Sequence, residues 1–131
     1  MSLRSKALGD TGEQLAAQYL ELHGYCIVDT NVRPVGGRAR GEIDLIAWDG
    51  EYLVFIEVKS RRSTNRLQIA PILAVDYRKR QQIVWLTDFY LAKHRLDDIP
   101  IRFDIVEILK KDPHDPIITL HRGAFDRTDC E

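Results

Sequence analysis

The chain has 131 residues, of which 44% are hydrophobic and 30% charged, with a formal net charge of −1. This length allows one hydrophobic core, so we predict a single domain over residues 1–131, and two cysteines are too few for a disulfide framework or a zinc-ligand set. No apolar run approaches the roughly 18–20 residues of a membrane span, and Met1–Lys6 lacks the apolar core of a signal peptide, which predicts a cytoplasmic protein.

The first predicted element is a helix from Asp10 to His23, where apolar residues recur at helical spacing. Two pairs are alternative capping boxes at its start, Asp10 with Glu13 and Thr11 with Gln14. Glu13 is therefore either a helix cap or an inward-pointing carboxylate, because it shares a helical face with alanine and leucine residues.

Residues 25–30 form an apolar run typical of a strand, and residues 31–40 follow it as a basic loop broken by proline and glycine. This loop carries Arg33, Arg38 and Arg40. Guanidinium groups on a loop suit contacts with a phosphate backbone.

The segment Gly41–Arg62 predicts a β-hairpin, because two β-branched or aromatic runs flank Asp49-Gly50. With these two residues as the turn, Asp44 falls opposite Phe55 and diagonal to Glu57. The alternation of side chains then places both carboxylates on one face of the hairpin.

Three charged groups thus converge on otherwise apolar strands: Asp44, Glu57 and Lys59. Buried carboxylates need a counter-ion, and two acidic oxygens suit Mg²⁺ or Mn²⁺. Lys59 would orient the attacking water or offset negative charge in a phosphoryl-transfer transition state. The ordinary alternative is a solvated ion pair on a strand face.

The remaining pattern predicts a helix capped by Asp76 and running to about Lys93, then strands over 101–109 and 117–121. The element order is αβββαββ. We therefore predict an α/β fold in which helices flank a mixed β-sheet.

Basic residues concentrate beside the predicted site, with seven of them against one acid between Lys59 and Arg80, a net charge of +6. Such a stretch indicates a surface that follows phosphates, although a solvated basic face without a partner stays open. The residues expected to contact nucleic acid are Arg33, Arg38, Arg40, Arg61, Arg62, Arg66, Arg78, Lys79 and Arg80.

Asp44, followed after a turn by Glu57-Val58-Lys59, resembles the PD-(D/E)xK pattern of restriction-endonuclease-like nucleases. More closely, Gly41–Ile46, Phe55–Arg61 and Arg102–Asp104 resemble the YraN-type bacterial family, whose members are similar to archaeal Holliday junction resolvases. The resemblance implies a restriction-endonuclease-like fold. It also implies that a glutamate of the first helix completes the acidic site, which here would be Glu13.

The leading functional hypothesis is a metal-dependent endonuclease that hydrolyses phosphodiesters of DNA, with structured DNA as one option. Its catalytic residues would be Asp44, Glu57, Lys59 and Glu13, and Asp44 and Glu57 would hold Mg²⁺ or Mn²⁺. A non-catalytic nucleic-acid-binding module and a structural partner in a larger complex are the alternatives. Nucleic acid, DNA in the first place, is the expected partner, and a homodimer stays open.

Overall fold

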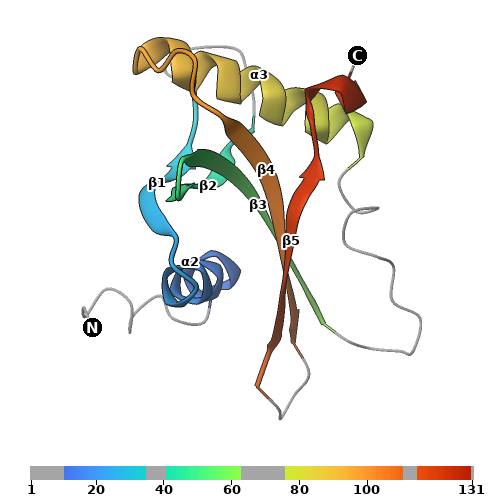
Figure 1. The fold of residues 1–131 in the computed structure, drawn as a ribbon. Helices are drawn as coiled ribbons and strands as arrows, with labels where there is room; N and C mark the ends of the chain where they lie inside the picture. The colour runs from blue at the N-terminus through green and yellow to red at the C-terminus, as the bar shows by residue number, and fades with distance from the viewer. Residues whose placement is uncertain (1–10, 35–40, 63–75, 111–114, 131) are drawn as a thin grey trace.

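The computed structural model describes residues 11–34, 41–62, 76–110 and 115–130 (Figure 1). The order αβββαββ is as predicted, with a short 3-10 helix after the last strand. The elements are α2 (Gly12–Leu22), β1 (Cys26–Val32), β2 (Ile43–Asp49), β3 (Tyr52–Arg62), α3 (Tyr77–Lys93), β4 (Ile101–Lys110), β5 (Ile117–Phe125) and η2 (Arg127–Cys130).

One five-stranded sheet holds the strands in the order of the sequence, β1-β2-β3-β4-β5. Strands β3 and β4 are parallel, and the other neighbours are antiparallel. A parallel pair needs a crossover connection, and α3 lies between β3 and β4 in the chain. The mixed sheet is confirmed. Both outer strands extend further than predicted, β1 to Val32 and β5 to Phe125.

The two long helices cover opposite faces of the sheet (Figure 1). On one face, Leu86 of α3 belongs to a buried cluster with Phe55 and Phe103. On the other, Leu20 of α2 belongs to a cluster with Val54 and Val106. Side chains along β3 point alternately to the two faces of the sheet. Glu57, two residues after Phe55, therefore points to the same face as Phe55, the face that α3 covers.

Helix α2 is capped by Thr11, which belongs to one of the two predicted capping pairs, whereas Asp10 of the other pair lies outside the described residues. The hydroxyl of Thr11 accepts a hydrogen bond of 3.1 Å from the backbone N–H of Gln14. Gly12 then lies so close to β3 that an added Cβ would come 2.0 Å from Oγ of Ser60. Since Thr11 provides the cap, Glu13 is free to face the sheet.

The hairpin turn differs from the prediction by one position on each strand. Asp49 pairs with Tyr52, so Gly50 and Glu51 form the two-residue loop, and Gly50 has the positive φ of 61° that such loops favour. The ladder therefore pairs Leu45 with Ile56. The predicted pairing of Asp44 with Phe55 was wrong, but a slide by two residues keeps every side chain on its predicted face.

Helix α3 begins as predicted, with the carboxylate of Asp76 accepting a 2.9 Å hydrogen bond from the N–H of Lys79. Within the described part of the chain, no helix is long and apolar enough to cross a membrane.

Candidate metal centre

The candidate site lies where the β2–β3 ladder ends. The register reaches Leu45 and Ile56, and beyond it the carboxylate of Asp44 accepts a 2.8 Å hydrogen bond from the backbone N–H of Val58. Beyond Ile56, strand β3 continues to Arg62 paired with β4, and no other described strand pairs with it there. Because the pairing of β2 with β3 ends here, groups from both faces of the sheet approach the same point.

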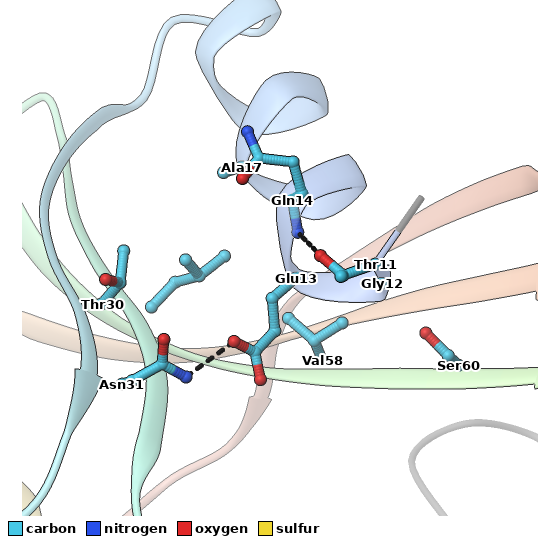
Figure 2. Close-up of a pocket in the computed structure, with 10 residues that line it drawn as sticks. Thr11, Gly12, Glu13, Gln14, Ala17, Thr30, Asn31, Val58 and Ser60 are labelled. Carbon is cyan, nitrogen blue, oxygen red and sulfur yellow. Dashed lines mark hydrogen bonds between the residues drawn. The ribbon is translucent and has the colours of Figure 1, made fainter. Parts of the chain in front are cut away.

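Three carboxylates gather at this point, those of Glu13, Glu42 and Asp44. One oxygen of each lies within 4.8 Å of the others. The side-chain amide of Asn31 donates to Glu13 at 2.6 Å and to Glu42 at 2.7 Å, and Arg33 donates to Glu42 at 2.8 Å. Figure 2 shows the first of these bonds, with the carboxylate of Glu13 directed toward Asn31. Like charges this close require donors or a cation.

Asn31 holds this position with a backbone φ of 49°, in the left-handed region. Asparagine visits that region more readily than most residues. A donor amide thus sits between two carboxylates that come from α2 and from the segment preceding β2.

Glu57 stands beside this group as a fourth carboxylate. Its residue is 6% exposed, and its Oε1 has no hydrogen-bond partner among the described residues. The other oxygen, Oε2, lies 3.9 Å from Nζ of Lys79 on α3. A buried carboxylate oxygen without a donor is costly, so this atom points to a ligand.

The electrostatics link Asp44 and Glu57 into one unit. Burial, and then the charge of Glu57, raise the pKa of Asp44 to about 8. Burial also raises the pKa of Glu57, although the charges of Lys79 and Lys59 oppose the effect. The two carboxylates therefore do not both ionise readily at neutral pH in the absence of a cation.

Glu42 behaves differently from this pair. Burial raises its pKa, but hydrogen bonds from Asn31 and Arg33 outweigh burial and hold that pKa below the ordinary value. Glu42 is therefore an ionised carboxylate next to the protonatable Asp44.

This donor set fits a hard divalent cation. All of its ligating atoms are carboxylate oxygens, which Mg²⁺, Mn²⁺ and Ca²⁺ prefer. The unpartnered oxygen of Glu57 and the raised pKa of Asp44 both mark negative charge that Lys79 and Arg33 compensate only in part. A cation held by Asp44 with Glu57, Glu13 or Glu42 would compensate the rest.

The structure brings close together the four residues that the sequence predicts to be catalytic. Asp44, Glu57 and Glu13 interact electrostatically, and Lys59 is close enough for its charge to lower the pKa of Glu57. Glu42 was not predicted to belong to the site. Its position two residues before Asp44, on the same side of an extended chain, was the available signal.

The predicted phosphate-contacting residues divide into four groups. Lys79 pairs with Glu57, and Arg33 pairs with Glu42, so both lie at the site. Arg61 and Arg80 instead face other side chains, Glu107 at 2.6 Å and the ring of Phe125 at 5.7 Å. Arg62 and Arg78 are exposed, and Arg38, Arg40 and Arg66 lie outside the described residues.

A cavity of about 440 Å³ opens on the α2 side of the same point. Its floor is apolar, from Ala17, Leu45 and Val58, and its walls carry hydroxyl and carboxamide groups. Glu13 lines the cavity (Figure 2) and also belongs to the acidic group, so the two adjoin each other at this residue.

Comparison with known proteins places this arrangement in a family. Residues 12–108 match the model of the Uncharacterised protein family UPF0102, a span that includes all four carboxylates. The chain belongs to the UPF0102 family. This is the YraN-type bacterial family that the sequence resembles.

Individual UPF0102 proteins match over most of their length. A UPF0102 protein of Dehalococcoides mccartyi is 40% identical over 126 residues, which cover 95% of this chain and 98% of that protein. One of Syntrophus aciditrophicus is 45% identical over 118 residues, covering 90% of this chain and 87% of that protein. One of Geobacter metallireducens is 45% identical over 108 residues, covering 82% and 84% respectively.

Proposed function

We propose that this UPF0102 protein is a divalent-metal-dependent endonuclease that hydrolyses phosphodiester bonds of DNA. Asp44 and Glu57 are the primary ligands of a Mg²⁺ or Mn²⁺ ion, Glu13 and Glu42 complete the acidic set, and Lys59 acts on the reacting groups. The resemblance of Asp44 and Glu57-Val58-Lys59 to the PD-(D/E)xK pattern supports the same assignment.

The observation that carries the proposal is the buried Oε1 of Glu57. This oxygen has no hydrogen-bond partner among the described residues, and it belongs to a carboxylate that interacts with Asp44. A purely structural carboxylate at 6% exposure is expected to have all its lone pairs satisfied. A carboxylate oxygen that binds a cation does not need a hydrogen-bond donor from the protein.

The residues of the chain have separable roles in the proposed hydrolysis. When bound, the cation polarises the phosphate and lowers the pKa of water. Lys59 donates a hydrogen bond to the water or to a nonbridging phosphate oxygen. The water gives up a proton to solvent as its oxygen forms a bond to phosphorus, and the leaving deoxyribose oxygen takes a proton from solvent as its bond to phosphorus breaks. Asp44, whose pKa is about 8 in the metal-free site, would give up its proton when the cation binds, and it then acts as a ligand.

The test is a cleavage panel of single-stranded, duplex, flap and four-way-junction DNA, together with RNA, in Mg²⁺ and in Mn²⁺. Native protein is expected to cut at least one DNA, and Glu57→Gln is expected to lose activity by about 10²-fold or more. Glu51→Gln is the matched control, because Glu51 is an exposed glutamate at the other end of the hairpin. Failure to cut any DNA in either metal would refute the proposal.

One observation favours the alternative of a non-catalytic nucleic-acid-binding module. Lys79, Asn31 and Arg33 already neutralise or satisfy part of the acidic group. A module of this kind would bind DNA in a salt-dependent way without cleaving it. Equal DNA affinity of native protein and Glu57→Gln, with no product from either, would favour the module.

A further inference from the structure

The cavity beside the acidic group has a chemistry unlike that of a phosphate site. Among its described lining residues, Glu13 is the only one with a charge. Gln14, Thr30 and Ser60 contribute groups that both donate and accept hydrogen bonds. Phosphates are usually bound by arginine, lysine or helix N-termini. The first turn of α2 does lie here, but the carboxylate of Glu13 disfavours an anion.

Neutral polar walls above an apolar floor suit a flat heterocycle with polar edges. Leu45, Val58 and Ala17 offer aliphatic contact for a ring face, and the hydroxyl and amide groups can bond to base edges and sugar oxygens. The volume of about 440 Å³ lies within the range of about 300–1,000 Å³ that is usual for small-ligand pockets. A base with its sugar is a ligand of this size and polarity.

The position of the cavity indicates where its nucleoside would lie relative to the phosphate at the acidic group. Glu13 lines the cavity, and its carboxylate oxygen lies within 4.8 Å of those of Glu42 and Asp44. The cavity is on the α2 face, whereas Lys79 approaches Glu57 from the α3 face. A group in the cavity and a phosphate at the acidic group are therefore near enough to belong to one nucleotide unit.

We propose that this cavity binds the unpaired nucleoside adjacent to the phosphodiester held at the acidic group. The inference rests on the proposed function and narrows its substrate class. A base that enters the cavity cannot remain stacked and paired, so the preferred DNA is single-stranded, or is unpaired at the point of cleavage.

Binding measurements test this inference without cleavage. Fluorescence anisotropy compares a single-stranded oligonucleotide, its duplex, and single-stranded versions with one abasic site at each successive position, in Ca²⁺ and in EDTA. One abasic position is expected to weaken binding about tenfold, and the duplex to bind at least about tenfold more weakly than the single strand. Equal affinity for all these DNAs in both buffers, or no binding to single strands, would overturn the inference.

Two variants assign the effect to the cavity. Ala17→Leu fills the cavity while keeping a good helix former. This variant is expected to bind intact DNA about tenfold more weakly than native protein and to bind intact and abasic DNA with equal affinity. Gln18→Leu is the matched control on the same helix, outside the cavity lining. Thr30→Val, at an exposed position where folding is not at risk, removes one hydroxyl at nearly constant volume and should weaken binding a few-fold.

The binding measurements and the cleavage panel can fail separately, so they distinguish failure of the nucleoside site from failure of the proposed nuclease function. If no DNA is cut but the abasic and Ala17→Leu effects appear, the nuclease proposal fails and the nucleoside site stands. If DNA is cut but neither effect appears, the site fails and the nuclease proposal stands.

Discussion

Asp104 and Glu57 are buried carboxylates on neighbouring strands, and they lie on opposite faces of the sheet. Their hydrogen-bonding surroundings differ sharply. Asp104 on β4 is 0% exposed and accepts hydrogen bonds from Tyr25, Arg102 and the N–H of Gly123. Glu57 on β3 is 6% exposed, has one oxygen without a partner in the described chain, and faces other carboxylates. The protein itself provides the hydrogen-bond donors for Asp104, whereas one oxygen of Glu57 stays available to a ligand.

The surroundings of Asp104 carry the marks of a structural network. Arg102 also bonds to Asp49 and to the hydroxyl of Tyr25, and its pKa rises, chiefly because it donates to Asp104. Burial, and then the hydrogen bond to Asp104, raise the pKa of Tyr25 to about 12. This network links Tyr25, just before β1, to β4, to β5 and to the hairpin, so its loss should affect folding rather than chemistry.

The largest expected effect is on the stability of Asp104→Asn. The change leaves Arg102 and Tyr25 without an anionic acceptor and is expected to lower the free energy of unfolding by about 3–5 kcal/mol. Urea denaturation in EDTA measures it. The matched Glu57→Gln should be neutral or stabilising under the same conditions, and an equal loss of stability in both variants would remove the contrast between them.

Lys59→Met separates catalysis from cation binding. Methionine keeps much of the length of the side chain but removes the charge, so we expect cleavage to fall about 10²-fold while Mn²⁺ affinity stays within a few-fold. Lys93→Met, at an exposed position near the end of α3, is the control. If Lys59 only pairs with the acidic residues, Lys59→Met should instead weaken Mn²⁺ binding, and cleavage at saturating Mn²⁺ should change little.

Asp44→Asn should stabilise the metal-free protein at high pH. The pKa of Asp44 is about 8 when folded, against an ordinary value of 3.8, so the folded state binds this proton more tightly and loses stability as pH rises from about 4 to 8. The variant lacks this loss, and we expect it to gain at least about 2 kcal/mol over native protein at pH 8–9 and little at pH 4.

Thermal or urea unfolding across this pH range, in EDTA, measures the difference. Asp97→Asn, at an exposed position, controls for the loss of a surface charge. A constant difference between native protein and Asp44→Asn from pH 4 to 9 would show that Asp44 titrates normally.

The smallest predicted effect concerns Asn31, which we regard as a positioning residue. Asn31→Gly keeps the positive φ but removes the donor that spans Glu13 and Glu42, so Mn²⁺ affinity should fall about threefold to tenfold with the fold intact. Asp98→Gly makes the same kind of change at another residue with a positive φ, 56°, and should leave affinity unaltered. Equal affinity in all three proteins would make Asn31 a backbone feature only.

The sequence predicted the elements because their signals are local. Apolar periodicity and the caps at Thr11 and Asp76 act within one turn, and the helices begin there. The Asp-Gly pair identified the hairpin but not which two residues form its loop, because either choice keeps the carboxylates of Asp44 and Glu57 on the same face. The face was therefore predictable, and the register was not.

Partners that are distant in sequence carry no local signal. Glu42 joins the site through Asn31 and Arg33 of the preceding strand and loop. Arg61 was expected to contact phosphate, yet it pairs with Glu107, which is 46 positions away. Asp104 and Glu57 look alike in sequence, because each acid lies between two apolar residues of a strand, and only the number of hydrogen-bond donors around each carboxylate separates them.

The central claim is tested most directly by Mn²⁺ binding measured by calorimetry at pH 7 in buffers of different ionisation enthalpy. The account predicts saturable binding that releases close to one proton, since Asp44 must give up its proton, and affinity that rises from pH 6 to pH 8. Asp44→Asn should bind at least about tenfold more weakly and release almost no proton, whereas Glu51→Gln should match native protein. No saturable binding, or binding by Asp44→Asn equal to that of native protein, would contradict the claim.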